Sequence, residues 1–212
     1  MTVPVRPDVL AVLAPGSLTG RTALVTGGGS GIGRATALLL ASMGARVAVV
    51  GRRPEALEAT ADMAAIAGGV HAVSAYTCDV REPELVDAML DSVLADFERI
   101  DILVNNAGGQ FVSPAESLNH KGFRAVTRLN LDATWYLTAR VAERSMLPNG
   151  YGKVVSITMS PHRGMPGMSH SSAARAGVES LMRTFAVEWG RHGIRTLALA
   201  PGIVHTLSLI HI

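Results

Sequence analysis

A glycine-rich segment carries the clearest chemistry in the sequence. It reads TGGGSGIG over residues 26–33, between a short apolar run and the helix-forming run RATALLLASM. Glycine lets the backbone approach a bound pyrophosphate closely, and free amides at the start of the next helix attract its negative charge. Any tight strand-to-helix turn can use glycine, so this segment indicates phosphate binding only when other motifs agree. The predicted contacts are Gly27, Ser30, Gly31, Ile32 and Gly33.

The end of the next apolar run predicts which dinucleotide would bind. That run ends VVGRRPEA, with Gly51 followed by Arg52 and Arg53. NAD-binding sheets of this kind commonly place Asp or Glu here, where the carboxylate binds the ribose 2′-hydroxyl. The carboxylate is missing, and a guanidinium can bind a 2′-phosphate through charge-assisted hydrogen bonds. Arg52 and Arg53 therefore predict NADP (NADPH); the alternative is that both are solvated residues at a helix start.

The elements that must position these groups follow a regular rhythm. Short apolar runs without polar alternation predict strands that are buried on both faces. The stretches between them are long enough for crossover helices, which right-handed connections place on both sides of a parallel sheet. We therefore expect a doubly wound α/β sheet of the Rossmann type with three layers. The predicted strands are residues 22–26, 45–50, 70–77, 101–105, 153–158 and 194–200.

The composition fits a single globular domain. Hydrophobic residues make up 48% of the 212 residues and charged residues 17%, with a formal net charge of +2. The basic residues are scattered, which argues against nucleic acid as a partner. No apolar run approaches the ~20 residues of a membrane helix. The single cysteine, Cys78, ends an apolar run and is expected in the core of a cytoplasmic protein.

The C-terminus departs from the rhythm of the chain. After Pro201 and Gly202 the sequence ends HTLSLIHI, with no turn signal or further helix. We expect one domain over residues 1–206 that is truncated and lacks its last strand, followed by a non-native tail over 207–212. A short natural C-terminus is the alternative. A truncated chain would leave an apolar strand edge unpaired and would be prone to aggregation.

Several motifs together resemble the short-chain dehydrogenase/reductase family. The spacing TGxxxGxG, the NNAG sequence at 105–108, Asp79-Val80 after the third strand, Asn130 in RLNLDATW and PGIVHT at 201–206 occur in the family's order. The resemblance covers residues 17–206. It implies an oxidoreductase with a nicotinamide cofactor, and an active-site role for Asn130. The further cofactor contacts that it implies are Asp79, Val80, Asn106, Ala107, Gly108, Pro201, Gly202 and Thr206.

The catalytic segment departs from the family pattern. Most members pair Tyr-x-x-x-Lys with a serine after the fifth strand, and the tyrosine exchanges a proton with a ketone or alcohol. Aligning RAGV with the family's KAGV places Ser171 at the tyrosine position and Arg175 at the lysine position. Aligning the fifth strand places Met159 at the usual serine. The tyrosine that would give its proton to a ketone is therefore missing.

The segment HSSAARAGV and the run NNAGGQFVSPAE are similar to peroxisomal trans-2-enoyl-CoA reductases and, more distantly, 2,4-dienoyl-CoA reductases. This resemblance implies NADPH-dependent reduction of the C=C bond of a 2-enoyl-CoA thioester. Hydride addition at the β carbon leaves an enolate, which needs hydrogen-bond donors rather than a strong acid. Ser171 could donate one such bond, Arg175 could bind the nicotinamide ribose, and Asn130 could order a water or a backbone kink. No residue is assigned as proton donor to the α carbon.

Three alternatives stay open. The chain could be a 3-oxoacyl or other carbonyl reductase with a rearranged acid, or a catalytically silent NADP-binding protein. Ser171 could serve only as an N-cap of the helix that follows it. His162 and His170 are expected to be solvated or structural rather than catalytic. Family members associate through the helices around 115–147 and 170–190, so a homo-oligomer is expected; no metal site is predicted.

Overall fold

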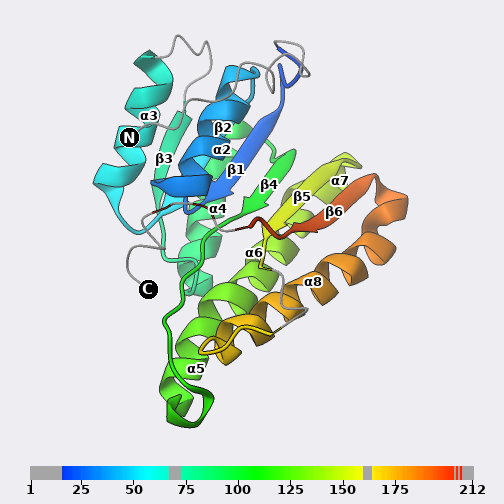
Figure 1. Ribbon diagram of the computed structural model, residues 1–212. Helices are drawn as coiled ribbons and strands as arrows, with labels where there is room; N and C mark the ends of the chain where they lie inside the picture. The colour runs from blue at the N-terminus through cyan, green and yellow to red at the C-terminus, as the bar shows by residue number, and fades with distance from the viewer. Residues whose placement is uncertain (1–15, 67–72, 160–163, 203, 205, 207–212) are drawn as a thin grey trace.

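The computed structural model describes residues 16–66, 73–159, 164–202, 204 and 206. Its centre is a parallel six-stranded sheet with the strand order β3-β2-β1-β4-β5-β6 (Figure 1). The strands are β1 (Thr22–Thr26), β2 (Arg46–Gly51), β3 (Val73–Thr77), β4 (Ile102–Asn105), β5 (Gly152–Ile157) and β6 (Ile194–Leu199). The doubly wound parallel sheet predicted from the sequence is confirmed.

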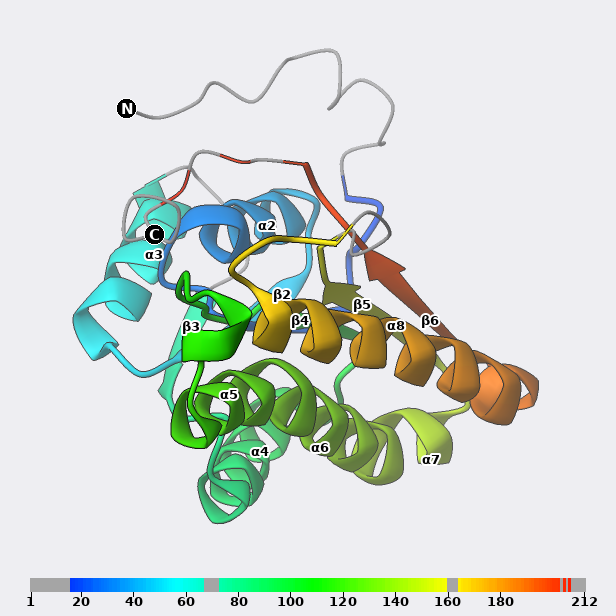
Figure 2. The same cartoon turned by 60° about the horizontal axis from the view of Figure 1, so that its bottom comes forward.

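Helices cover both faces of this sheet (Figure 2). The longer helices are α2 (Gly31–Ser42), α3 (Pro54–Ile66), α4 (Pro83–Phe97), α5 (His120–Thr127), α6 (Ala133–Val141) and α8 (Ser169–Trp189). Two π-helical turns, Arg128–Asp132 and Ala142–Met146, flank α6, and the short α7 (Leu147–Asn149) follows. Single 3-10 turns lie at Ala115–Ser117 and Gly190–His192.

Two hydrophobic cores separate the three layers. Leu90 of α4, Leu137 of α6 and Val178 of α8 pack on one face of the sheet. Ala37 of α2 and Leu57 of α3 pack on the other face. All five residues of β1 are buried, as expected for a central strand with helices on both sides.

Each predicted strand begins and ends within three residues of its observed position, but β6 differs in burial. Its side chains alternate, so that Ile194 is buried while Leu197 and Leu199 are about half exposed. Within the described residues β6 lies at the edge of the sheet and pairs with β5 alone. The apolar residues of β6 therefore lie on two faces of the strand, of which one is covered and the other is open. The strand is not buried on both sides as the run predicted.

The strand order creates the crevice in which a ligand can bind. β1 pairs with β2 on one side and with β4 on the other, so the chain adds β2 and β3 on one side of β1 and then returns to add β4, β5 and β6 on the other. Ligands of open parallel sheets bind at the carboxyl ends of the strands, at this point of reversal. The glycine-rich loop after β1 and the NNAG segment after β4 therefore lie side by side.

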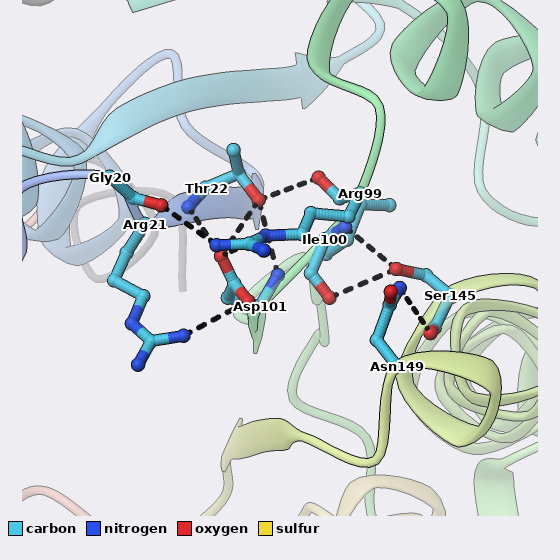
Figure 3. Close-up of polar contacts among 8 residues, drawn as sticks. All are labelled: Gly20, Arg21, Thr22, Arg99, Ile100, Asp101, Ser145 and Asn149. Atoms are coloured by element: carbon cyan, nitrogen blue, oxygen red, sulfur yellow. Dashed lines mark hydrogen bonds and ion pairs between the residues drawn. The ribbon is translucent and has the colours of Figure 1, made fainter.

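A polar network fixes the opposite end of the same two strands (Figure 3). The buried Asp101 carboxylate accepts hydrogen bonds from Thr22 N (3.0 Å) and Arg99 Nε (3.2 Å), and Arg21 forms an ion pair with it at 3.4 Å. Ser145 accepts a hydrogen bond from Ile100 N at 2.8 Å. These contacts join the starts of β1 and β4 to the second π turn.

Other sequence predictions concern burial and the chain ends. Cys78 lies in the core with 3% exposure, and burial raises the pKa of its thiol to about 11. Across the described residues, no helix has the length and apolar character that crossing a membrane demands. The proposed tail at 207–212 and His162 lie outside the described residues.

Candidate active site

The glycine-rich loop has the shape that a diphosphate requires. Gly27 has φ of +66°, and a Cβ there would lie 2.8 Å from Asn106 Nδ2. A Cβ on Gly33 would overlap the carbonyl oxygen of Gly27. Ser30 is the N-cap of α2, but its side chain makes no capping hydrogen bond. The hydroxyl and the first amides of α2 are thus left available for a ligand.

A cavity of about 450 Å³ opens beside this loop. Residues that follow β1, β2, β3 and β4 line it, so four carboxyl ends of the sheet converge there. Eight of the predicted cofactor contacts belong to the lining: Gly27, Ser30, Arg52, Arg53, Asp79, Val80, Ala107 and Gly108. Seven lining residues were not predicted: Gly29, Val50, Gly51, Ala56, Leu57, Cys78 and Leu129. Three of these, Gly29, Gly51 and Cys78, adjoin a predicted cofactor contact in the sequence, which is the signal that could have identified them.

Two arginines and one aspartate carry the charges of the cavity lining. Arg52 and Arg53 are exposed at the start of α3, and within the described residues neither forms an ion pair. Gly51 ends β2 with no carboxylate to repel a phosphate. Asp79 is an acidic residue of the cavity lining, and Arg81 Nε donates a bifurcated hydrogen bond to its two carboxylate oxygens, at 2.9 and 3.1 Å. The hydrogen bonds from Arg81 lower the pKa of the Asp79 carboxyl.

The NNAG segment is tied to the end of β1. Thr26 Oγ1 accepts hydrogen bonds from the backbone amides of Asn106 (3.0 Å) and Ala107 (2.9 Å). Asn106 Nδ2 donates back to the Thr26 carbonyl oxygen at 3.0 Å. Asn105 is buried and donates to Thr138 Oγ1 at 2.8 Å. These bonds hold Ala107 and Gly108 open to the cavity.

The segment after β6 returns to the glycine-rich loop. Pro201 and Gly202 follow the end of β6, and Thr206 Cγ2 lies 3.1 Å from the position that a Cβ on Gly31 would take. Thr206 is therefore next to the first turn of α2, where Ile32 and Gly33 also lie. The structure thus brings the predicted contacts from both ends of the chain to one loop.

Asn130 occupies the first π-helical turn and is fully buried. Its side chain pairs with the backbone of Gly109: Oδ1 accepts from the amide at 3.0 Å, and Nδ2 donates to the carbonyl oxygen at 2.9 Å. The structure thus places Asn130 at an irregular turn, where it fixes the loop that follows β4. π turns of this kind are frequent at functional sites.

Arg175 lies behind this loop on α8. Its guanidinium donates to the Ile157 carbonyl oxygen at 2.7 Å and to Asn130 Oδ1 at 3.5 Å. Within the described residues it has no carboxylate partner. Burial lowers the pKa of Arg175 to about 10, so the group stays charged at neutral pH. A Cβ on Gly108 would overlap the guanidinium, so a glycine is needed there.

Ser171 is not the N-cap of α8, which corrects one alternative raised by the sequence. The helix begins at Ser169 with Met168 as its N-cap. The Ser171 hydroxyl is buried and donates to Gln110 Oε1 at 2.6 Å. Gln110 was missed because its partner lies 61 residues away in sequence. Its place directly after the NNAG segment, where β4 ends, is the signal that could have identified it.

Two further side chains surround Ser171. Met159 Sδ lies 3.4 Å from Ser171 Oγ, so a thioether stands where the family resemblance implies a serine. His170 is fully buried, so of the two expected roles, solvated or structural, its side chain has the structural one. Its Nδ1 accepts from the Ser171 amide at 2.8 Å, and its ring packs edge-on against Phe111. Within the described residues its Nε2 has no hydrogen-bond partner.

Comparisons with known proteins agree with this geometry. A probable 2,4-dienoyl-CoA reductase of Bacillus subtilis (strain 168) is 39% identical over 86% of this chain and 72% of its own length. An uncharacterized oxidoreductase of Caenorhabditis elegans is 38% identical over 92% of this chain and 62% of its own length. The solved structure of the citronellol catabolism dehydrogenase AtuB of Pseudomonas aeruginosa PAO1 is 46% identical, with a TM-score of 0.85. That alignment covers 90% of this chain and 77% of AtuB.

The chain spans between 62% and 72% of the length of these two curated relatives. A family model described as short chain dehydrogenase matches residues 21–210, nearly the whole chain. The matched range contains the glycine-rich loop, the NNAG segment, Asn130 and the Ser171–Arg175 segment. The chain therefore belongs to the short-chain dehydrogenase/reductase family of oxidoreductases, which bind a nicotinamide cofactor.

Proposed function

We propose that this oxidoreductase uses NADPH to reduce the C=C bond of a 2-enoyl-CoA thioester in fatty acid metabolism. The observation that carries the proposal is the hydrogen bond from Ser171 to Gln110 at the position where carbonyl reductases of the family need an acid. The cofactor supplies a hydride when bound. The residues of this chain then have to bind and stabilise the acceptor.

The Ser171–Gln110 pair suits an enolate better than an alkoxide. A serine hydroxyl has one proton, and here Gln110 Oε1 accepts it. This leaves the Gln110 amide nitrogen as a neutral donor toward the substrate. Neutral donors can stabilise the oxygen of an enolate, but a ketone needs a proton on oxygen as hydride arrives. We propose that the thioester oxygen lies beside this pair.

Arg175 adds a fixed positive charge to the same region. Its guanidinium contacts Asn130 but no carboxylate within the described residues, so the charge is not neutralised locally. Because arginine keeps its proton at neutral pH, Arg175 can stabilise developing negative charge and bind the nicotinamide ribose, but it does not transfer protons. The proton for the α carbon then comes from solvent.

The surroundings of Ser171 support an apolar substrate. Phe111, Val112 and Met165 expose between 39% and 56% of their surface, and Ser113 N donates to the Gly167 carbonyl oxygen at 2.8 Å. The two loops that carry these apolar side chains are thus joined beside the catalytic segment. An acyl chain would cover such side chains.

The proposal extends to the cofactor and the assembly. Arg52 and Arg53, without a neighbouring carboxylate at Gly51, support NADPH over NADH. Phe123 and Trp135 are exposed on α5 and α6, which supports association of copies through these helices. A reduced, buried Cys78 agrees with a cytoplasmic location.

Stopped-flow NADPH oxidation tests the proposal. We expect turnover with crotonyl-CoA and little with acetoacetyl-CoA. Reduction of acetoacetyl-CoA at the higher kcat/KM would instead identify a carbonyl reductase with a rearranged acid. Tight NADPH binding without turnover of either thioester would identify a catalytically silent binding protein.

A further inference from the structure

Arg34 lies in the first turn of α2, directly behind the glycine-rich loop. Its Nε donates to Thr60 Oγ1 at 3.0 Å, and one terminal nitrogen donates to the carbonyl oxygens of Gly29 and of Ala56, the latter at 3.4 Å. All three acceptors are neutral, and no ion pair joins Arg34 to any described acid. A guanidinium fork can hold several acceptors in fixed directions, which a single ammonium cannot. Arg34 thus joins the loop to the first turn of α3, which lies next to α2 (Figure 1).

Thr60 completes this arrangement from α3. Its side chain is fully buried, and its hydroxyl lies 3.0 Å from the Gly28 carbonyl oxygen and 3.1 Å from the Ala56 carbonyl oxygen, so that its one proton is shared between them. The loop also packs tightly on α3, because a Cβ on Gly29 would lie 3.0 Å from Ala56 Cβ. Two successive carbonyl groups of the loop, those of Gly28 and Gly29, are therefore bound from the protein side.

The direction of these carbonyl groups fixes the direction of two amides. In a trans peptide the C=O and the following N–H point in opposite directions. The carbonyl of Gly28 shares a peptide group with the amide of Gly29, and the carbonyl of Gly29 shares one with the amide of Ser30. Both amides thus point away from Arg34 and Thr60. Neither has a hydrogen-bond partner within the described residues, and Gly29 and Ser30 both line the cavity.

We propose that Arg34, together with Thr60, is a positioning residue for the diphosphate of the cofactor. By holding the carbonyl groups of Gly28 and Gly29, Arg34 orients the amides of Gly29 and Ser30 toward the cavity before the cofactor binds. The inference rests on nicotinamide cofactor binding, which family membership gives, and does not depend on the choice of NADPH over NADH. It assigns to Arg34 a role that its charge alone would not supply.

Two substitutions separate position from charge. Arg34→Lys keeps the positive charge but cannot reach three acceptors at once, and Thr60→Val removes the hydroxyl with little change in shape. Matched controls are Arg183→Lys and Thr184→Val, the same changes on exposed residues of α8. For each variant we would titrate NADPH, NADH and 2′-AMP at a temperature at which circular dichroism shows a fully folded chain.

We expect Arg34→Lys to weaken NADPH and NADH by the same factor, about tenfold, which corresponds to the loss of one or two hydrogen bonds in a binding site. Thr60→Val should weaken both by about threefold. The affinity for 2′-AMP, which has no diphosphate, should stay within about twofold of wild type, and the control variants should match wild type.

Other outcomes overturn the inference. Wild-type affinity of Arg34→Lys for NADPH would show that charge alone matters, or that Arg34 has no role in binding. An equal loss for 2′-AMP and NADPH would show that Arg34 only maintains the fold. Failure of the wild-type chain to bind 2′-AMP would contradict the proposed 2′-phosphate site at Arg52, while the two dinucleotide titrations would still decide the role of Arg34.

Discussion

At the scale of single residues, the hydrogen bond from Ser171 Oγ to Gln110 Oε1 decides which side chain can donate to a substrate oxygen. The RAGV motif, which begins at Arg175, aligns Ser171 and Arg175 with the tyrosine and lysine positions of the family. Gln110 could not be predicted as the partner of Ser171. Its Oε1 lies 2.6 Å from Ser171 Oγ only because the loop after β4 packs against α8. The burial of His170 was unpredictable for the same reason. Tertiary contacts thus decide the chemistry of residues whose positions a motif reveals.

We predict that Ser171→Ala lowers kcat for crotonyl-CoA by up to ~10²–10³, the usual cost of losing one oxyanion donor, which in the proposed mechanism is the amide nitrogen of Gln110. Without Ser171 the amide of Gln110 loses the partner that orients it. The affinity for NADPH should be nearly unchanged, since Ser171 does not line the cofactor cavity. Ser172→Ala is the matched control, and single-turnover NADPH oxidation is the measurement. A wild-type kcat for Ser171→Ala would refute the mechanism.

We predict that Arg52→Asp weakens NADPH binding far more than NADH binding. Arg52 is exposed beside the cavity and forms no ion pair within the described residues, so its charge is available to a phosphate. Losing one charge-assisted contact and adding repulsion should cost about 2–4 kcal/mol. Fluorescence titration with both cofactors measures it, and Arg191→Asp, on a distant exposed turn, serves as control. Equal loss for both cofactors would contradict the assignment.

We predict that Arg175→Met does not lower the melting temperature of the cofactor-free chain. Burial lowers the pKa of Arg175 to about 10, so below that pH the folded chain holds a charge that would be better solvated in the unfolded chain. This unfavourable contribution would diminish only as pH rises above about 10. Calorimetry at pH 8 checks the prediction, and a fall of about 5 °C or more would contradict it. NADPH should bind more weakly to the variant.

At the scale of elements, strands were predictable and helix irregularities were not. The short apolar runs of β1 and β4 predicted strands, and both strands are fully buried between two helical layers. The π turn at Arg128–Asp132 leaves no mark on the hydrophobic pattern, although it carries Asn130. In this turn Asn130 pairs with Gly109, a contact across 21 residues. The turn that matters most for the site is thus the one that periodicity does not reveal.

The polar network at the start of β1 and β4 belongs to the same scale (Figure 3). We predict that Asp101→Asn lowers the free energy of unfolding by about 2–4 kcal/mol, because a buried charged acceptor is lost among several donors. Thr22 N, Arg99 Nε and Arg21 all bind this carboxylate, which is 4% exposed. Urea denaturation measures the change.

The control for this prediction is Arg21→Ala. Arg21 is 37% exposed, so its ion pair with Asp101 should contribute about 0–1 kcal/mol. An Asp101→Asn variant as stable as Arg21→Ala would show that the network does not hold the two strands. Activity per folded molecule should be unchanged, because Asp101 lies at the end of the sheet opposite to the cavity.

At the scale of the whole molecule, the two ends of the sheet differ in role: one end is held by a polar network, and the other carries the cavity. The amino ends of β1 and β4 are fixed by Asp101, while the loops that follow their carboxyl ends line the cofactor cavity. Two cores of comparable burial hold the helices on either face. The position of the cavity could be predicted from the order of strands and motifs in the chain, but the Asp101 network could not. An unpaired apolar edge at the sixth strand was expected, whereas the sequence does not reveal that β3 forms the other edge.

The edge at β6 leads to the last prediction, which concerns self-association. Leu197 and Leu199 project from one face of β6 and are about half exposed, and β6 pairs only with β5 within the described residues. An exposed apolar strand at a sheet edge is a template for pairing with another chain. We therefore expect these 212 residues to associate as concentration rises, measured by light scattering after size-exclusion chromatography.

The double substitution Leu197→Glu/Leu199→Glu should shift this association to higher concentration, because charge on an edge strand opposes pairing. Val187→Glu, on the highly exposed face of α8, is the matched control for the added charge. Equal suppression by the control would show that net charge, and not the strand edge, governs association.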